Sequence, residues 1–237
     1  MIETYSYLNM YLIVGGLWLG LNLLGIFYSK FILVNTTFSL SRIRNHHYNE
    51  SSFRDHLPLI LTNLFLMVII FPVGLYLMSD WILVGYQNIW ITLLQLFGVL
   101  LIDDFYFYCY HRLLHKSPFL FKKIHKIHHR ATSPLPSDYL YEHPLEWMLG
   151  LLGPFIAFLI LGGVSSLTII LLLIIKVLHE LDIHSGIKSS IYRYIPFVGI
   201  NEYHSMHHKY RDVHFASVFS IWDYVFRTHH LSKKPKK

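Results

Sequence analysis

The sequence predicts an all-α integral membrane protein, with about four or five apolar spans and a histidine-rich helical cap on the cytoplasmic side of the membrane. Three observations support this fold class. Hydrophobic residues make up 54% of the chain and charged residues only 14%, whereas soluble domains carry roughly 25% charged residues. Apolar runs close to the length of a membrane-spanning helix recur along the chain. Histidines gather in clusters directly beyond some of these runs.

The expected spans are separated by short polar connections. The first run lacks a basic leader and a small-residue cleavage site, so we expect it to stay in place rather than be removed as a signal peptide. The last two runs are joined by Gly162-Gly163, and they could cross the membrane as a tight hairpin or only re-enter it. The five runs cover residues 5–28, 57–78, 89–108, 145–161 and 164–181.

Lysine and arginine set the expected orientation. They are concentrated in residues 29–56, 112–130 and after 188, and they are absent from 79–88 and 162–166. Basic loops remain on the cytoplasmic side of a membrane, so we expect the N-terminus outside and every histidine cluster on the cytoplasmic side. The net charge of +6 does not indicate nucleic-acid binding, because the basic residues form no long polar face.

Three histidine clusters carry the chemistry: His111-x-x-x-His115, His125-x-x-His128-His129 and His204-x-x-His207-His208. Residues three and four apart share a helical face, so we expect each cluster to present its imidazoles together to a metal centre. Two more histidines, His179 and His184, end the last apolar run in KVLHELDIHSG. They are either interfacial polar residues or further ligands. Ten imidazoles are too many for one tetrahedral ion and suit two metals.

The other histidines and the single cysteine have plainer expected roles. Cys109 is the single cysteine of this sequence, so it has no partner for a disulfide within the chain. We expect it to be a small buried hydrophobic residue. His143 is expected to cap or orient a helix rather than bind metal. We expect solvated loop positions for His46, His47 and His56, and tail positions for His229 and His230.

The residue types narrow the choice of metal. Imidazole suits zinc, copper, iron and nickel. The sequence contains no E-x-x-H, so a di-iron site would be of an all-histidine kind. A redox metal beneath apolar spans favours oxidation of a membrane lipid by O2. A histidine-rich metal transporter is the alternative, although transport sites usually lie at the bilayer midplane rather than beside the spans.

The motifs HRLLH, HKIHH, EHPLE, DIHSG, HSMHH and FASVFSIWDYVF resemble those of the membrane fatty acid hydroxylase and sterol desaturase superfamily. The resemblance covers roughly residues 100–230, and EHPLE and DIHSG look most like the C4-methylsterol monooxygenases. It implies two iron ions and O2-dependent hydroxylation of an unactivated C–H bond in a lipid, with a sterol 4-methyl group as the leading substrate. The alternative within the superfamily is a fatty acyl or sphingoid hydroxylase or desaturase.

The resemblance also implies roles for individual residues. The catalytic ligands would be the eight histidines of the three boxes, His111, His115, His125, His128, His129, His204, His207 and His208, with His184 in DIHSG and His179 as further metal ligands. Candidate carboxylates that orient these rings are Asp103, Asp104, Asp138, Asp182, Glu202 and Asp223. Two positions depart from the family pattern: His214-Phe215 replaces Asn-Tyr, with a contact behind the ligands expected for His214, and Arg227 replaces glycine.

The implied organisation is an N-terminal transmembrane region (1–100), a fatty acid hydroxylase-like di-iron domain (101–230) and a basic tail (231–237). No flavin, haem or nucleotide motif is present, so the resemblance implies an external electron donor such as cytochrome b5, or a ferredoxin with its reductase. A basic face that includes Lys122, Lys123 and Lys126 could steer such a donor. The expected compartment is the endoplasmic reticulum of a eukaryote or the inner membrane of a bacterium.

Overall fold

The computed structural model describes residues 2–35, 41–43, 50–85, 87–189 and 192–229. Within these ranges the chain is mainly helical, as the sequence predicts, and its strands are the two-residue pair β1 (Ile82–Leu83) and β2 (Val164–Ser165). The helices of the bundle are α1 (Ile2–Val34), α2 (Glu50–Leu77), α3 (Ile89–Lys116), α5 (Pro144–Gly150), α6 (Leu152–Ile160) and α7 (Ser166–Ile183). The remaining helices are α4 (Pro118–Leu120), α8 (Asn201–Tyr210) and α9 (Ile221–Val225).

Three of the described helices are long and apolar enough to cross a membrane: residues 7–34 of α1, α2 and α3. The sequence predicts four or five spans. The two remaining apolar runs are the broken pair α5–α6, which is shorter, and α7, whose last two turns carry Lys176, Glu180 and Asp182. The first two helices are longer than the predicted runs: α1 continues past residue 28 to Val34, and α2 begins before residue 57, at Glu50.

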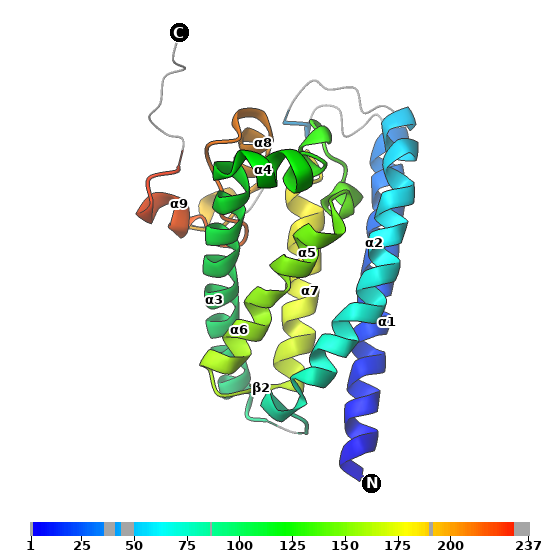
Figure 1. Ribbon diagram of the computed structural model, residues 1–237, viewed down its shortest axis with the longest axis vertical. Coiled ribbons are helices and arrows are strands. Elements are labelled where there is room, and N and C mark those ends of the chain that lie inside the picture. Colours follow the sequence, from blue (N-terminus) through cyan, green and yellow to red (C-terminus); the bar gives the residue numbers. More distant parts are fainter. Residues whose placement is uncertain (1, 36–40, 44–49, 86, 190–191, 230–237) are drawn as a thin grey trace.

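The helices run side by side and give the bundle two different ends (Figure 1). α6 descends beside α3 to a turn at β2, and α7 returns to the end where α4 and α8 lie. The turn uses Gly162 and Gly163 at φ of +69° and +115°, a backbone region that glycine adopts without strain. The end of α3 and the end of α7 therefore lie close to the histidine-bearing segments around α4 and α8.

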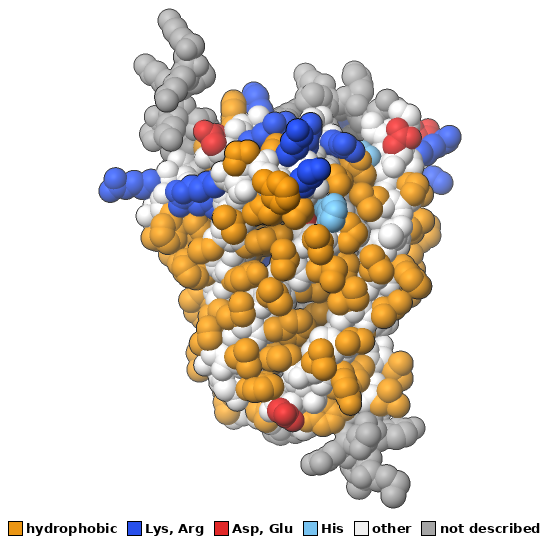
Figure 2. Space-filling view, in the orientation of Figure 1, with side chains coloured by type: hydrophobic (Ala, Val, Ile, Leu, Met, Phe, Trp, Pro, Cys, Tyr) orange, Lys and Arg blue, Asp and Glu red, His pale blue; other side chains and the backbone are white. Residues whose placement is uncertain are grey.

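Apolar side chains cover the outside of the bundle, and lysine and arginine gather near one end (Figure 2). Phe65, Leu94 and Phe97 are examples of large hydrophobic residues that are more than half exposed. Cys109 is exposed on α3, so the expectation that it is buried is wrong. In a membrane helix an apolar neighbourhood does not imply burial, because the lipid-facing side is apolar as well.

A buried polar residue ties α2 to the segment that precedes α5. The amide of Asn63 donates to the carbonyls of Leu140 and Glu142, both at 2.8 Å, and accepts from the indole Nε1 of Trp147 at 3.0 Å. These bonds satisfy the polar atoms of an otherwise apolar helix face. They also fix the EHPLE segment against the bundle.

Candidate metal centre

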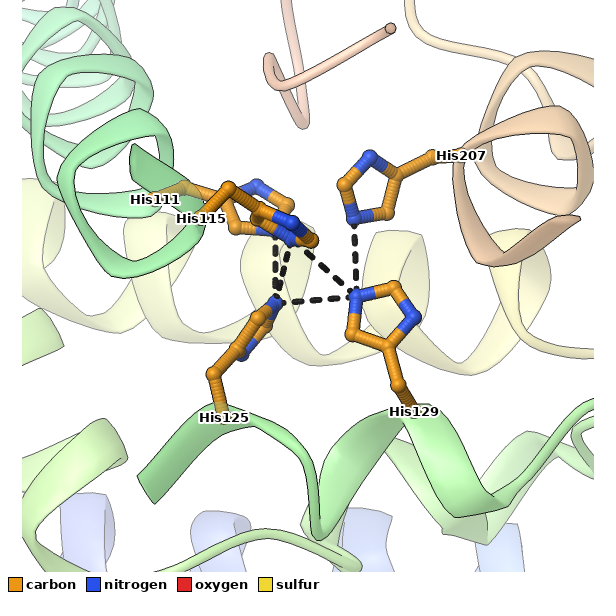
Figure 3. Close-up of side chains that lie close together, drawn as sticks. All are labelled: His111, His115, His125, His129 and His207. Atoms are coloured by element: carbon orange, nitrogen blue, oxygen red, sulfur yellow. Dashed lines mark hydrogen bonds between the residues drawn. The ribbon is translucent and has the colours of Figure 1, made fainter. Parts of the chain in front are cut away.

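Histidines from separate parts of the chain meet where the ends of α3, α7 and α8 come together (Figures 1 and 3). They form two groups in which one ring nitrogen of each member lies within 4.8 Å of the others. The five-histidine cluster contains His111, His115, His125, His129 and His207, and the four-histidine cluster contains His128, His184, His204 and His208. Five and four make nine of the ten histidines that the sequence predicts as ligands, and the tenth, His179, lies outside both clusters.

Each H-x-x-H-H box divides its histidines between the two clusters. The first and last histidine of a box enter one cluster, and the middle histidine enters the other. Successive residues on a helix are rotated by about 100°, so His207 and His208 point apart although they are neighbours. The expectation that a whole box serves one centre is therefore wrong for its middle member. His125, His129 and His207 lie in the five-histidine cluster, whereas His204, His208 and His128 lie in the four-histidine cluster.

The two boxes reach this arrangement on different backbones. The HKIHH box begins on a π-helical turn, Phe121–His125, in which the N–H of Lys126 donates to the carbonyl of Phe121 at 2.8 Å. It ends on a 3₁₀ turn at His128–Arg130. Wide turns of this kind occur often at functional sites. The HSMHH box lies on α8 and the His111-x-x-x-His115 cluster lies on α3, both regular α-helices, so HKIHH departs from the predicted helical geometry and the other two match it.

Backbone carbonyls orient two ligands of the five-histidine cluster. His111 Nδ1 donates to the carbonyl of Phe215, and His207 Nδ1 donates to the carbonyl of Val213, both at 2.8 Å. A carbonyl only accepts hydrogen bonds, so both neutral rings carry their proton on Nδ1 and leave a lone pair on Nε2. The segment after α8 thus fixes the tautomer of both rings.

The Nε2 lone pairs converge inside the cluster. His125 Nδ1 lies 2.6 Å from the carboxylate of Glu146, so its free lone pair is on Nε2 as well. His111 Nε2 lies 3.2 Å from His125 Nε2, and His207 Nε2 lies 3.2 Å from His129 Nε2 (Figure 3). The Nε2 lone pairs of His111 and His125 cannot form a hydrogen bond with each other. A cation between them satisfies both, and a nitrogen-rich donor set suits a first-row transition metal.

Burial keeps these rings neutral, as metal ligands must be. Removal from water lowers the pKa of His128 to about 4, with the positive charge of neighbouring imidazoles as a smaller cause. The same two causes hold the pKa values of His125, His204 and His208 well below the usual range. At neutral pH each ring therefore offers a lone pair.

Comparison with known proteins identifies the family that uses this arrangement. The profile of the fatty acid hydroxylase family matches residues 96–228, more than half of the chain. The chain belongs to the fatty acid hydroxylase family. The match contains the histidines of both clusters, so the clusters are the histidine-box site of this family.

Individual relatives carry two kinds of name. Methylsterol monooxygenase 1 of Rattus norvegicus is 32% identical over 192 residues, which cover 75% of this chain and 64% of the rat protein. Methylsterol monooxygenase erg25B of Aspergillus fumigatus is 28% identical over 160 residues, or 65% of this chain and 54% of the fungal protein. Very-long-chain aldehyde decarbonylase GL1-10 of Oryza sativa subsp. japonica is 32% identical over 139 residues, or 56% of this chain and 46% of the rice protein. This chain therefore spans about half to two thirds of these relatives. No solved structure matches it.

Two glutamates touch the ligands of this fatty acid hydroxylase family member, and neither is among the carboxylates predicted from the sequence. Glu146 faces His125, and the Glu180 carboxylate lies 3.6 Å from His184 Nδ1, which also donates to the Glu180 carbonyl at 2.8 Å. Their signal in the sequence is an ionisable residue inside an apolar run, which in a membrane segment usually indicates function.

Two of the predicted carboxylates bind the backbone near the orienting carbonyls, and not the histidine rings. Asp104 is fully buried and accepts the backbone N–H groups of Ser217, Val218 and Phe219 at 3.2, 2.8 and 2.9 Å. Asp223 accepts the N–H of Phe215 at 2.8 Å. Both carboxylates therefore hold the segment whose carbonyls orient the rings, instead of bonding the rings themselves.

The other predicted carboxylates have separate partners. Asp103 forms an ion pair with Lys176 at 2.8 Å between α3 and α7. Asp138 lies 3.0 Å from His56 Nδ1. The carbonyl of Asp182 accepts from Asn201, and Glu202 accepts the N–H of Ser189 at 3.1 Å. These contacts connect helices and loops around the centre.

The remaining histidines lie outside the clusters. His179 is half-buried beside Gly199 and Ser217. His143 accepts from the N–H of Leu145 at 3.1 Å and caps α5, as expected. The expectation of a solvated loop is wrong for His56, which lies within α2 and stacks on Tyr141 at 3.7 Å, and that of a tail is wrong for His229, which stacks on Tyr224 at 4.0 Å. His214 stacks on Tyr203 at 4.7 Å. His46, His47 and His230 lie outside the described residues.

A cavity of about 150 Å³ reaches both clusters from within the bundle; we call it the apolar cavity. Its walls are largely hydrophobic and come from α1, α2, α3, α5, α6 and α7. Histidines of both clusters line it as well. The hydrophobic lining residues include Trp18, Met67, Phe107, Leu114, Trp147, Leu151, Pro154 and Val177, and the lining histidines are His111, His125, His128, His184 and His204.

Proposed function

We propose that this protein is a membrane-bound di-iron monooxygenase that hydroxylates an unactivated C–H bond of a lipid, with a sterol 4-methyl group as the leading substrate. The observation that carries the proposal is the apolar cavity, because a hydrophobic substrate in it would lie against histidines of both clusters. A metal transporter is disfavoured, because the clusters lie at one end of the long helices instead of at their middle.

The two clusters suit two iron ions, which would supply the coupling of O2 reduction to C–H oxidation. The chain itself would hold each ion with neutral imidazoles, and it would fix their direction through Phe215, Val213 and Glu146. The hydrophobic walls would keep water from the reacting carbon and present the lipid to both clusters at once.

One carboxyl group is suited to hold a proton in the apolar cavity. Glu142 lines this cavity, and burial, followed by the charge of Glu146, raises its pKa well above the usual range. Hydroxylation consumes protons: R–H + O2 + 2 e⁻ + 2 H⁺ gives R–OH + H2O. We propose that the Glu142 carboxyl oxygen supplies one proton of this kind inside the apolar cavity.

The membrane placement is part of the proposal. The short pair α5–α6 and α7 would add a hairpin to the three long spans, which gives five crossings with the N-terminus outside. Support comes from the lysine and arginine side chains, which gather at the end of the bundle that holds the clusters (Figure 2). Such a belt suits a cytoplasmic membrane surface, in the endoplasmic reticulum of a eukaryote or the inner membrane of a bacterium.

The relatives and the sequence motifs favour a sterol as the lipid. Two of the relatives above are named methylsterol monooxygenases, and EHPLE and DIHSG resemble that branch. The third is named an aldehyde decarbonylase, so a long-chain lipid is the second candidate. A cavity of about 150 Å³ holds a group about the size of benzene, so either lipid would enter with its reacting end only.

The test is mass spectrometry of lipids after incubation of the protein under ¹⁸O2 with an electron source. We expect one ¹⁸O atom in a hydroxyl group of the product, and no product from a His128→Ala variant that still inserts into the membrane. Label in a 4-methyl sterol supports the leading substrate, and label in a fatty or sphingoid chain overturns only that choice. Product formed without O2, or undiminished in His128→Ala, contradicts the proposed reaction.

A further inference from the structure

A second opening reaches the five-histidine cluster and shares no lining residue with the apolar cavity. It is an open cleft of about 480 Å³ between the end of α3, the segment after α8 and the segment after α9. We call it the basic cleft. It lies at the end of the molecule where lysine and arginine gather (Figure 2).

The basic cleft carries an excess of positive charge. Arg112, Lys116, Arg211 and Arg227 line it, against the single carboxylate of Asp212. In the part of the chain that the structure describes, none of these four cations forms a salt bridge. The cleft therefore offers its charge to a partner from outside.

Aromatic side chains position two of these cations without neutralising them. Arg112 donates to the hydroxyl of Tyr108 at 3.0 Å, and the guanidinium of Arg211 lies 5.4 Å from the ring centre of Phe121. Arginine and aromatic residues together are typical of the centres of protein interfaces. The exposed ring of Phe226 adds an apolar contact at the rim.

Two of the arginines occupy strained backbone positions. Arg211 has φ of 65° and Arg227 has φ of 56°, in the left-handed region that costs a residue other than glycine about 1–3 kcal/mol. At Arg227 the family pattern has glycine, which adopts this conformation without strain. An arginine held there against its backbone preference indicates a use for the side chain.

The basic cleft also leads to the metal ligands. His115 lines it and is half-buried, whereas the other four members of the five-histidine cluster are buried. The ring of His115 lies 5.3 Å from Phe121, which forms another wall of the cleft. One cluster can thus be approached from two sides, from the lipid through the apolar cavity and from water through the basic cleft.

We propose that the basic cleft is the docking site of a small acidic electron-transfer protein, which delivers electrons to the five-histidine cluster past His115. The inference rests on the proposed function, because that reaction consumes two electrons for each O2. Two reduced carriers would each give up one electron and leave oxidised, while R–H, O2 and two protons become R–OH and water. The positive cleft attracts an acidic carrier and repels a basic one.

The test uses the full-length protein in lipid nanodiscs and the soluble haem domain of an acidic cytochrome b5 as the probe. Arg227→Gly removes one charge and relieves the backbone strain, so this variant should fold and keep its metal. We expect its Kd for the probe and its KM for the reduced probe to rise about fivefold to tenfold at low salt, as for a lost charge pair at an interface. The difference should shrink at high ionic strength.

Lys122→Gln is the matched control, because Lys122 is exposed and carries the same charge but does not line the cleft. It should change the Kd for the probe less than twofold. An equal effect of Lys122→Gln would mean that the probe senses only the overall charge, and this would overturn the proposal. An unchanged Kd for the probe in Arg227→Gly would also overturn the proposal. Pyrophosphate, a small anion, is tested as an alternative ligand: if Arg227→Gly weakens the binding of pyrophosphate but not of the probe, the proposal is overturned as well.

A chemical reductant separates this inference from the proposed function. With dithionite and a small mediator as the electron source, Arg227→Gly should match the unsubstituted protein in product formation. Absence of O2-dependent product under these conditions would contradict the proposed function. Product in the presence of dithionite, together with cytochrome binding that is indifferent to Arg227, would overturn only the docking site.

Discussion

Replacing Glu146 with glutamine should weaken metal binding at the five-histidine cluster while the fold is kept. The Glu146 carboxylate lies 2.6 Å from His125 Nδ1, and both side chains are buried. Glutamine preserves the shape and can still accept one hydrogen bond, but it removes the negative charge that makes His125 a stronger ligand. Hydrogen bonds to charged groups contribute about 1.5–3 kcal/mol, against about 0.5–1.5 for neutral pairs.

The expected loss is the difference, about 1–1.5 kcal/mol, which corresponds to roughly tenfold in affinity. This agrees with the 10–100-fold range seen when partners of metal ligands are changed. The assay is a titration of metal-free protein with Fe²⁺ or Co²⁺ in competition with a chelator, fitted to two sites. Only one of the two sites should weaken.

The chain offers a matched control in its other close histidine–carboxylate pair. Asp138 lies 3.0 Å from His56 Nδ1, and neither residue belongs to a cluster. Asp138→Asn should therefore leave both metal affinities within twofold of the unsubstituted protein. Equal losses in Glu146→Gln and Asp138→Asn, or no loss in Glu146→Gln, would refute the assignment of Glu146 as the orienting group.

Two further predictions concern the supports of the site. Asp104→Asn places an amide N–H group against one of the three backbone N–H donors that the carboxylate accepts. The free energy of unfolding in detergent should therefore fall by about 2–3 kcal/mol. An unchanged free energy of unfolding would contradict the role of Asp104. Acid should release metal, because burial lowers the folded-state pKa of His128 to about 4 while the unfolded value is about 6.5. As the pH falls from about 6.5 to 4, the unfolded chain binds the proton before the folded chain does, so the free energy of unfolding decreases. A metal content that stays constant down to pH 4 would contradict the predicted release.

The gathering of these histidines could be predicted from the sequence because its signal is local. A spacing of three or four residues places imidazoles on neighbouring helix positions, and the eight histidines with this spacing do meet, together with His184. The split of the box histidines between two clusters could also be predicted, because His207 and His208 are separated by about 100° on any α-helix. The π-helical turn at Phe121–His125 was not, because it is set by packing.

The groups that orient the ligands were harder to predict. The acceptors of His111 and His207 are backbone carbonyls, which every residue carries, so no residue type marks Phe215 or Val213. Asp104 and Asp223 are recognisable as buried carboxylates, but their role depends on where the chain returns after α8. Glu146 carried a usable signal, an acid within an apolar run.

The fold shows the same limit. The apolar runs predict the positions of the long helices, whereas their ends depend on turns that continue into polar sequence, as at Val34 and Glu50. Cys109 illustrates a related limit, because apolar composition does not tell the lipid-facing side of a membrane helix from its packed side.

The number of metal ions bound per chain tests the central claim most directly. Protein purified without oxygen and analysed for elements should contain two iron ions per chain, one for each cluster. His204→Ala removes a ligand of the four-histidine cluster alone and should reduce the content toward one, with the five-histidine cluster still loaded. One ion or none in the folded, unsubstituted protein would contradict a two-metal centre.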